Sequence, residues 1–338
     1  MIELNVLSKF QLSSFLIYLF AFFLTFFLVP LFSKIAFKFN ILDKPDGKLK
    51  KHSRAIPYLG GVAIYFGFVI SLITAKICLN IDINILFLGG ITLLLILGLV
   101  DDLYVLSPKA KILGQFLSCL FLVKSLINFN FDIFTSVYAC FLMFWLLSLI
   151  NAFNLIDIMD GLAISVACLS ATFFLFYATF FSDFSLSALL LSLLGATSAF
   201  YCYNKPPAKI YLGDAGSLFL GGTLAFIPLT LLNKLQPISI NLLILPIFLL
   251  AVPILELIGL ILIRMYKKIP IYLGSPDHFA IYLQKKGWAK GNILVFAAIL
   301  SVVLFFISFF YIFNFINIFL FLFLSIISLL LWCIIIYT

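Results

Sequence analysis

The sequence contains little charge and no long polar stretch. Only 10% of its 338 residues are Asp, Glu, Lys or Arg, whereas soluble proteins carry about 25%. Hydrophobic residues make up 65% of the chain, and the mean hydropathy is +1.27. The longest stretch without a membrane-length apolar run is 264–290. This composition excludes a soluble enzyme, a disordered chain and a nucleic-acid-binding protein, and it predicts an integral membrane protein.

Histidine is scarce, and the cysteines follow no metal-binding pattern. The chain has two His and six Cys, and the Cys lie in or beside apolar runs without a C-x-x-C spacing. The sequence therefore indicates neither a disulfide framework nor a thiolate metal site. We interpret the cysteines as small apolar packing residues.

Long apolar runs dominate what is present. A membrane helix needs about 20 apolar residues. On that criterion the candidate spans are 12–35, 58–75, 84–100, 110–127, 133–150, 161–181, 185–203, 215–232, 239–263, 291–313 and 316–337. The predicted fold is an all-α polytopic bundle of ten or eleven transmembrane helices, forming a single domain over residues 1–338. The loop 264–290 is expected to hold a short interfacial helix, with Ser275 as its N-cap and Pro276 as its first residue.

Lys and Arg gather in alternate loops. Of the 21, only Lys9, Lys76, Lys124 and Lys234 lie in the other set. Because Lys and Arg accumulate in short cytoplasmic loops, the N-terminus is expected outside and the C-terminus in the cytoplasm. Acids do not orient membrane proteins, so the acids in the same basic loops need a chemical reason. They are Asp43, Asp46, Asp101, Asp102, Asp157, Asp160, Asp214 and Asp277.

Asp101 and Asp102 end the third span. Adjacent carboxylates repel one another unless a cation or a proton intervenes. A magnesium site or a general base would explain the pair, and a solvated helix end is the simpler alternative.

Polar side chains recur every third residue at the end of the fifth span, as Asn151, Asn154, Asp157 and Asp160. All four line one face only if the segment tightens toward 3₁₀ geometry. Their oxygens suit a hard cation or the ribose and phosphates of a nucleotide. A polar helix terminus explains only part of the row.

A glycine-rich turn, Gly213-Asp214-Ala-Gly-Ser217, precedes the eighth span. Its glycines allow close approach of a ligand, and Gly213 and Ser217 lie where a helix N-terminus offers free N–H groups to a phosphate. An acid beside a phosphate is unfavourable unless a divalent ion joins them, so Asp214 is the predicted metal ligand. A turn capped by Asp is the alternative.

Two further segments carry candidate phosphate ligands. Lys51 and His52 precede a Pro57-x-x-Gly-Gly turn, where they either meet an anionic group or only fix the topology. His278 is expected in the first turn of the short helix in 264–290, where it would contact phosphate. Glu256 lies inside the ninth span, and a carboxylate at such depth is a functional candidate.

Five segments in order carry a family resemblance: DKPDGKLKKHSRAIPYLGG, GLVDDLYVLSPKAKILGQ, NAFNLIDIMDGLA, YLGDAGSLFLGG and VPILELIGLILIR. Together they resemble the polyprenyl-phosphate N-acetylhexosamine-1-phosphate transferases of glycosyltransferase family 4, to which the phospho-MurNAc-pentapeptide translocase is a cousin. The resemblance implies a bundle of ten or eleven helices with its active site on the cytoplasmic face.

The resemblance also implies roles for single residues. Asp214 would bind Mg²⁺, with Mn²⁺ as the alternative ion and Asn154 as a further ligand. Asp101 or Asp102 would act as a base or bind the phosphate of the second substrate. The nucleotide pocket and the phosphate-holding positions would be formed by Asn151, Asn154, Asp157, Asp160, Lys51 and His52.

The implied reaction moves an N-acetylhexosamine-1-phosphate, with N-acetylglucosamine as first choice, from a UDP-sugar to undecaprenyl phosphate. UMP is released, and a cell-envelope glycan is started at the bacterial inner membrane. The partners are thus a UDP-N-acetylhexosamine, undecaprenyl phosphate and the lipid bilayer, with no nucleic acid. The oligomeric state stays open, a homodimer included.

Three positions depart from the family pattern. Ile158 replaces a usual Gly, Glu256 replaces a usual Asp, and the H-x-H-H segment is reduced to Pro276-Asp-His-Phe-Ala280. The H-H-H segment of the translocase cousin is also absent, which argues against a MurNAc-pentapeptide substrate. Two other functions stay open: a transporter or lipid flippase, for which acids near the midplane would be expected, and an inactive scaffold.

Overall fold

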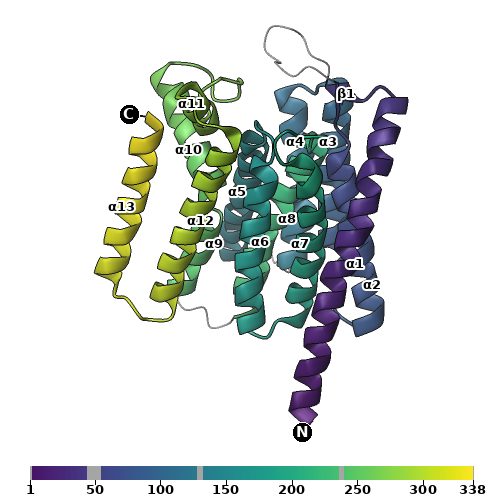
Figure 1. The fold of residues 1–338 in the computed structure, drawn as a ribbon. Coiled ribbons are helices and arrows are strands. Elements are labelled where there is room, and N and C mark those ends of the chain that lie inside the picture. The colour runs from purple at the N-terminus through teal and green to yellow at the C-terminus, as the bar shows by residue number, and fades with distance from the viewer. Residues whose placement is uncertain (1, 44–54, 128–131, 236–239, 338) are drawn as a thin grey trace.

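The computed structural model describes residues 2–43, 55–127, 132–235 and 240–337, and for 2–12 and 240 it describes the backbone only. Nearly all of this is helix (Figure 1). Two short strands, β1 (Leu42–Asp43) and β2 (Ile56–Pro57), pair antiparallel. The helices are α1 (Ile2–Lys38), α2 (Gly60–Leu79), α3 (Ile85–Tyr104), α4 (Pro108–Leu126), α5 (Ile133–Ile156), α6 (Leu162–Phe180), α7 (Phe184–Asn204), α8 (Gly213–Lys234), the 3₁₀ turn η1 (Ile240–Ile244), α9 (Leu245–Leu249), α10 (Ala251–Tyr266), α11 (Phe279–Lys285), α12 (Lys290–Ile312) and α13 (Ile318–Tyr337).

The predicted all-α membrane bundle is confirmed. Within the described part of the chain, nine helices are long and apolar enough to cross a membrane. The pair Asn241–Leu249 and Ala251–Tyr266, bent by 73°, adds a tenth span if it is counted as one. The remaining predicted span, 110–127, corresponds to α4. That helix has 19 residues but is not among the nine, and Lys109, Lys111 and Lys124 interrupt its apolar sequence.

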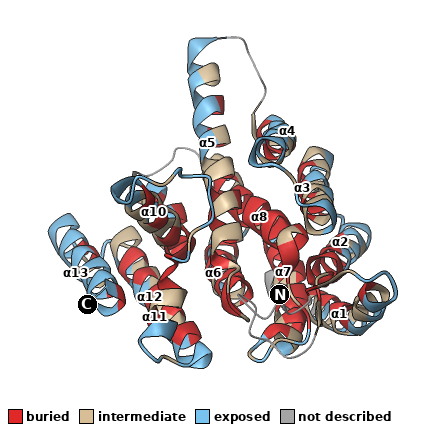
Figure 2. Cartoon of the chain, turned by 90° about the horizontal axis from the view of Figure 1, so that it is seen from above, coloured by how far each residue is buried: buried red, intermediate tan, exposed pale blue. Residues whose placement is uncertain are grey.

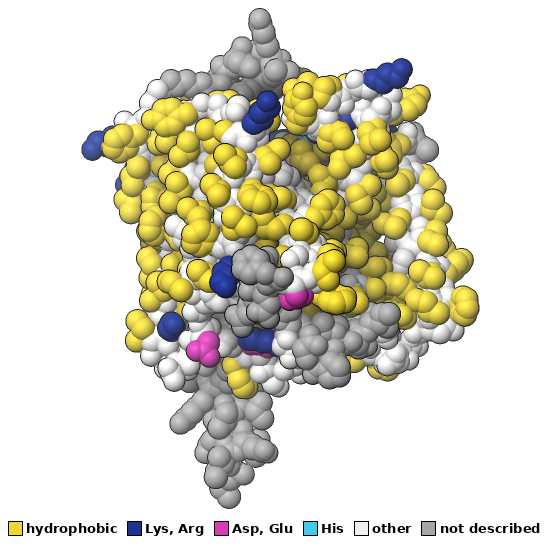
Figure 3. Space-filling view, turned by 180° about the vertical axis from the view of Figure 1, so that it is seen from behind, with side chains coloured by type: hydrophobic (Ala, Val, Ile, Leu, Met, Phe, Trp, Pro, Cys, Tyr) yellow, Lys and Arg dark blue, Asp and Glu magenta, His cyan; other side chains and the backbone are white. Residues whose placement is uncertain are grey.

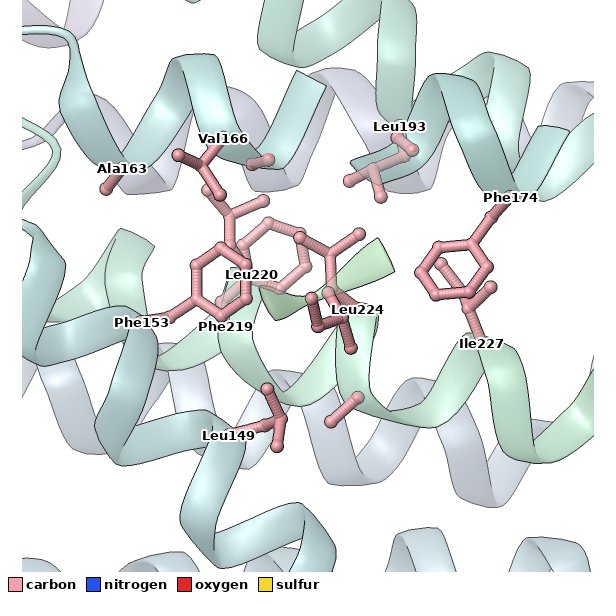
Figure 4. Close-up of a cluster of buried hydrophobic side chains, with 14 of the residues drawn as sticks. Leu149, Phe153, Ala163, Val166, Phe174, Leu193, Phe219, Leu220, Leu224 and Ile227 are labelled. Carbon is pink, nitrogen blue, oxygen red and sulfur yellow. The ribbon is translucent and has the colours of Figure 1, made fainter. Parts of the chain in front are cut away.

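Helix α8 forms the centre of the bundle. Of its most apolar 18-residue window, 89% is buried, and Figure 2 shows it surrounded by other helices. Leu149 and Phe153 of α5 point toward α8 near Leu220, and Phe174 of α6 lies beside Ile227 of α8 (Figure 4). The helix carries Gly216, Gly221 and Gly222, and small residues of this kind let neighbouring helices approach closely from several sides. This composition fits the central place of α8.

Glycines bring α2 and α3 against the first turn of α8. A Cβ atom on Gly61 would overlap the backbone of Gly216, and one on Gly98 would overlap the backbone of Asp214 and Ala215. Small residues of this kind let membrane helices approach closely. The backbone around Asp214 is therefore held from two sides.

The outer surface is apolar. Figure 3 shows hydrophobic side chains across the middle of one face, with charged side chains toward its upper and lower parts. Only 17% of the α13 window is buried, and Phe134 and Phe144 of α5 project from the bundle with 84% and 71% exposure. Such a surface is compatible only with lipid, and the protein is a multi-pass membrane protein.

The acids gather at one end of the bundle, the upper end in Figure 1. Asp101 and Asp102 lie in the last turn of α3, Asp157 follows α5 directly, and Asp214 lies in the first turn of α8. The alternating directions of the helices bring the described basic loops to this end as well. That this end faces the cytoplasm stays a prediction.

The short helix in 264–290 begins later than predicted. Helix α11 starts at Phe279, so placing Pro276 at its first position was wrong. The reason is that side chains draw the preceding residues back onto α10. Arg264 donates from Nε to Ser275 Oγ at 3.1 Å, and Lys267 Nζ lies 2.6 Å from Asp277 Oδ1.

Candidate active site

Four helices contribute one side chain each to a charged cluster, defined here as Asp101 (α3), Lys111 (α4), Asn154 (α5) and Asp214 (α8). Lys111 Nζ lies 2.8 Å from Asp101 Oδ2 and 2.6 Å from Asp214 Oδ2. It also lies 3.4 Å from Asn154 Oδ1. Three oxygens from three helices thus converge on a single ammonium group.

Within the cluster, Asn154 of α5 bonds two residues of α8, Asp214 and Ser217. Its Nδ2 donates to Asp214 Oδ1 at 2.7 Å and to Ser217 Oγ at 3.0 Å. Asp214 and Ser217 are three residues apart and share one face of the helix. The structure therefore brings these three predicted site residues together.

Asp102 faces the backbone of α8, although it neighbours Asp101. Its carboxylate accepts the N–H of Asp214 at 2.8 Å and the N–H of Ala215 at 3.1 Å. An anion at a helix N-terminus satisfies unpaired donors and opposes the positive end of the helix dipole. Of the N–H groups expected to be free for a phosphate at this helix N-terminus, those of Asp214 and Ala215 are therefore occupied by a carboxylate from α3.

Gly213 makes this cap geometrically available. Its φ is +73°, a conformation that L side chains rarely adopt, and a Cβ there would lie 2.7 Å from Asp102 Oδ2. Asp101 is held differently, since its Oδ1 accepts the N–H of Leu106 at 2.6 Å where the chain leaves α3. The two adjacent carboxylates therefore diverge, one toward Lys111 and one toward α8.

The four polar residues Asn151, Asn154, Asp157 and Asp160 do not share one site, because each has different partners. Helix α5 ends at Ile156, and the Asp157 N–H bonds the Asn154 carbonyl at 3.3 Å, which is the expected 3₁₀ tightening limited to a single bond. Asp160 lies 2.8 Å from Lys290 Nζ and accepts the N–H of Ala208 at 3.3 Å. Only Asn154 enters the charged cluster.

Asn151 is occupied by α4. Its Nδ2 donates to Gln115 Oε1 at 2.8 Å and to the Leu147 carbonyl at 2.8 Å, and Gln115 Nε2 donates back at 3.3 Å. Gln115 is fully buried. This amide pair joins α4 to α5 one turn away from Lys111 and Asn154. Asn151 therefore helps to fix the two helices that carry Lys111 and Asn154.

Asp157, which follows α5 directly, carries a perturbed carboxyl group. Burial and the neighbouring carboxylates of Asp214, Asp102 and Asp160 raise its pKa well above the ordinary Asp value. Each of these causes disfavours the charged form. A perturbed carboxyl beside other acids is typical of functional sites.

Of the predicted phosphate ligands outside the cluster, the structure describes His278 but not Lys51 or His52. His278 is buried, and its Nδ1 lies 2.7 Å from Glu256 Oε1, while the Phe279 N–H bonds Glu256 Oε2 at 3.3 Å. The intramembrane Glu256 thus has a partner in the loop that follows α10. Lys51 and His52 lie outside the described residues.

Lys111 and Gln115 are site residues that the sequence analysis did not single out. Lys111 was counted only as a charge that fixes topology. The available signal was its position four residues before Gln115, which places two polar groups on one face of a helix with an otherwise largely apolar sequence.

The oxygens of the cluster suit a hard cation. No group of three His, Cys, Asp or Glu side chains is placed to hold a metal ion in the described part of the chain. Mg²⁺, however, is commonly bound by only one or two carboxylates together with substrate phosphates. The convergence of Asp101, Asp214 and Asn154 on an ammonium fits that donor set.

Comparison with known proteins identifies the family to which the chain belongs. The family model described as "Glycosyl transferase family 4" matches residues 84–232, from α3 into α8. The phospho-N-acetylmuramoyl-pentapeptide-transferase of Staphylococcus aureus is 30% identical over 64% of this chain and 74% of its own length. The chain belongs to this family. The matched segment contains all four residues of the charged cluster.

Two other relatives point the same way. The probable undecaprenyl-phosphate N-acetylglucosaminyl 1-phosphate transferase of Bacillus subtilis is 29% identical over 74% of this chain and 72% of its own length. The undecaprenyl-phosphate alpha-N-acetylglucosaminyl 1-phosphate transferase of Thermotoga maritima is 33% identical over 60% and 61%. The resemblance stated from the motifs is confirmed, and the protein is a membrane transferase.

Proposed function

We propose that this family member transfers an N-acetylhexosamine-1-phosphate, most simply that of N-acetylglucosamine, from a UDP-sugar to undecaprenyl phosphate. UMP leaves, and the lipid-linked sugar starts a cell-envelope glycan at the bacterial inner membrane. The observation that carries the proposal is the convergence of Asp101, Asp214 and Asn154 oxygens on one cation at the end of the bundle. The printed names of the relatives supply the class of reaction.

In this proposal Asp214, Asn154 and Asp101 would hold a Mg²⁺ ion, with Mn²⁺ as the alternative. The ion would neutralise the donor diphosphate and the charge that develops on the leaving UMP. Asp157, whose carboxyl group interacts electrostatically with Asp214 and Asp160, would line the nucleotide pocket together with Asp160. Asp102 would act indirectly, because its cap fixes the backbone from which Asp214 projects.

The reaction itself needs no strong base. An oxygen of undecaprenyl phosphate forms a bond to the β-phosphorus of the UDP-sugar, and the bond from that phosphorus to the UMP oxygen breaks. A phosphate monoester has a second pKa of about 6 and is already ionised at neutral pH. Neither Asp101 nor Asp102 is then required to remove a proton, and both carboxylates serve electrostatics and positioning.

The depth of the acids supports an enzyme over a transporter. Transport sites lie near the bilayer midplane, often at broken helices, whereas Asp101 lies in the last turn of α3 and Asp214 in the first turn of α8. At a helix end, a lipid phosphate and a water-soluble donor meet without either crossing the membrane. The lipid tail would lie along the apolar outer surface.

The test is UMP release by the purified full-length chain in detergent, with undecaprenyl phosphate, Mg²⁺ and a panel of UDP-sugars. We expect release to require lipid, metal and an N-acetylhexosamine donor, and to fall at least about 100-fold in Asp214→Asn. The matched control is Asp183→Asn, an acid paired with Lys234 outside the charged cluster, which should keep its activity. A folded protein that releases no UMP with any sugar would overturn the proposal and favour a scaffold.

A further inference from the structure

The Lys111 ammonium occupies a position built like a cation site. Two carboxylate oxygens and one amide oxygen surround it, at 2.8, 2.6 and 3.4 Å. The side chains of Lys111, Asp101 and Asp214 are 18%, 9% and 31% exposed. Charges that are largely covered need partners, and here Asp101 and Asp214 both pair with the same lysine.

A divalent cation would need the same oxygens, because the second oxygen of Asp101 accepts the Leu106 N–H and that of Asp214 accepts Asn154 Nδ2. Mg²⁺ binds oxygen at about 2.0–2.1 Å, so an ion on Asp101 and Asp214 would lie at most about 5 Å from an ammonium that kept its contacts to them. Two cations at that separation in a poorly solvated site repel strongly. Lysine and metal therefore compete for one set of ligands.

The lysine head can leave without movement of its helix. The Gln115–Asn151 amide pair fixes α4 against α5 one turn further along, which holds the Lys111 backbone in place. The side chain itself has a flexible four-carbon stem, and its partial exposure leaves a path toward solvent.

We propose that Lys111 is an exchangeable internal counter-ion, whose ammonium group pairs with Asp101 and Asp214 until a divalent cation displaces it toward solvent. The inference rests on the metal site of the proposed function. It assigns Lys111 a positioning role: it keeps the two carboxylates together and close to Asn154, and it sets the affinity of the site for metal.

The test is the chemical accessibility of Lys111 in the purified full-length protein in detergent. An amine-reactive acetylating reagent attacks only an uncovered, unprotonated amine, so an ammonium held by three oxygens is protected. We expect acetylation of Lys111, measured by mass spectrometry, to rise several-fold on addition of saturating Mg²⁺. The exposed Lys109 on the same helix should be unaffected, and Asp214→Asn should abolish the rise.

A second measurement uses Mn²⁺ binding followed by electron paramagnetic resonance. Lys111→Met removes the competitor and should tighten Mn²⁺ binding at least about tenfold, whereas Lys109→Met should leave it unchanged. Flat acetylation of Lys111 while Mn²⁺ binds would overturn the proposal, as would unchanged or weaker Mn²⁺ binding in Lys111→Met.

Neither measurement needs substrate or turnover. UMP release with flat Lys111 labelling would leave the proposed function standing and remove only the counter-ion exchange. Absence of both Mn²⁺ binding and Mg²⁺-dependent UMP release would remove the exchange and the metal site together.

Discussion

Asp101 and Asp102 illustrate how two adjacent, chemically identical residues acquire different tasks. At the end of α3 their side chains point to different neighbours, so Asp101 meets Lys111 and Asp102 caps α8. The capping carboxylate satisfies two backbone donors of a helix that has no cap from its own side chains. Asp102 is thus a positioning residue for Asp214.

The first prediction concerns this cap. Asp102→Ala leaves the N–H groups of Asp214 and Ala215 without their acceptor and should lower the free energy of unfolding by about 1 kcal/mol. UMP release should fall strongly because Asp214 loses its fixed position. Thermal unfolding in detergent and the release assay check both effects. Asp132, which accepts the N–H of Thr135 at the start of α5, provides the control: Asp132→Ala should lose similar stability but keep activity.

The second prediction concerns Asp157 and pH. Since its pKa is raised in the folded protein, the folded state binds more protons than the unfolded state above the ordinary pKa of about 4, and stability falls as pH rises through that window. Asp157→Asn removes the loss of stability at higher pH, because the amide is never charged. The variant should unfold at a higher temperature than wild type at pH 7 to 8, and the difference should vanish toward about pH 4. UMP release by the variant should still fall.

Asp277 serves as a control, because its pKa is shifted in the opposite direction to that of Asp157. Although burial opposes it, hydrogen bonds from Lys267 and Tyr282 lower the pKa of Asp277. Its contribution to stability is present above the ordinary Asp pKa and is lost as pH falls toward the lowered value. Asp277→Asn should therefore unfold at a lower temperature than wild type at neutral pH, with a gap that narrows on acidification. Parallel pH profiles for the two variants would contradict both assignments.

Helix α8 is the element on which the site depends. It is the most buried of the spanning helices described, and its first turn is contacted by glycines of α2 and α3. Because α3 carries Asp101 and Asp102, the close packing of α3 on α8 also sets the distance between these acids and Asp214.

The third prediction tests that packing. Gly98→Ala places a Cβ on the backbone of Asp214 and Ala215, which should cost about 1–3 kcal/mol by overpacking and should reduce UMP release by separating α3 from α8. The matched control is Gly259→Ala on α10, where a Cβ would make only an ordinary contact with Tyr337 and where alanine favours the helix. Equal unfolding temperatures for the two variants would refute the proposed tight contact.

At the scale of the whole molecule, charge distribution and architecture agree. The acids of the charged cluster and the described basic loops share one end of the bundle (Figure 1), and hydrophobic side chains cover the middle of the face drawn in Figure 3. The departure of the His segment from the family pattern also has a structural context, because the remaining His278 is paired with Glu256 inside the protein.

The fourth prediction concerns orientation. Lys and Arg retained on the cytoplasmic side should leave the N-terminus outside and the C-terminus inside. An epitope tag at the N-terminus should be digested by protease added to intact spheroplasts, whereas a C-terminal tag should be digested only after permeabilisation. The reverse pattern would place the charged cluster outside and contradict a donor that comes from the cytoplasm.

The sequence by itself determined the membrane class, most of the spans and the end at which the acids gather, and it predicted Asp214 and Asn154, which the structure brings together, as metal ligands. These properties follow from local composition, since the length of an apolar run and the position of a polar residue at its end are read along the chain. The start of α11 was misplaced because Ser275 and Asp277 are drawn to Arg264 and Lys267, contacts that a local capping rule does not include.

Only the tertiary structure decided which acids face which partners. Asp102 and Asp214 are 112 residues apart in the chain, and Lys111 and Asp214 are 103 apart. Such pairs form only because α3, α4, α5 and α8 pack side by side, and a helix rotated by one residue would direct the same side chains to lipid. Packing therefore determined the cap on α8, the lysine between two carboxylates and the Glu256–His278 pair.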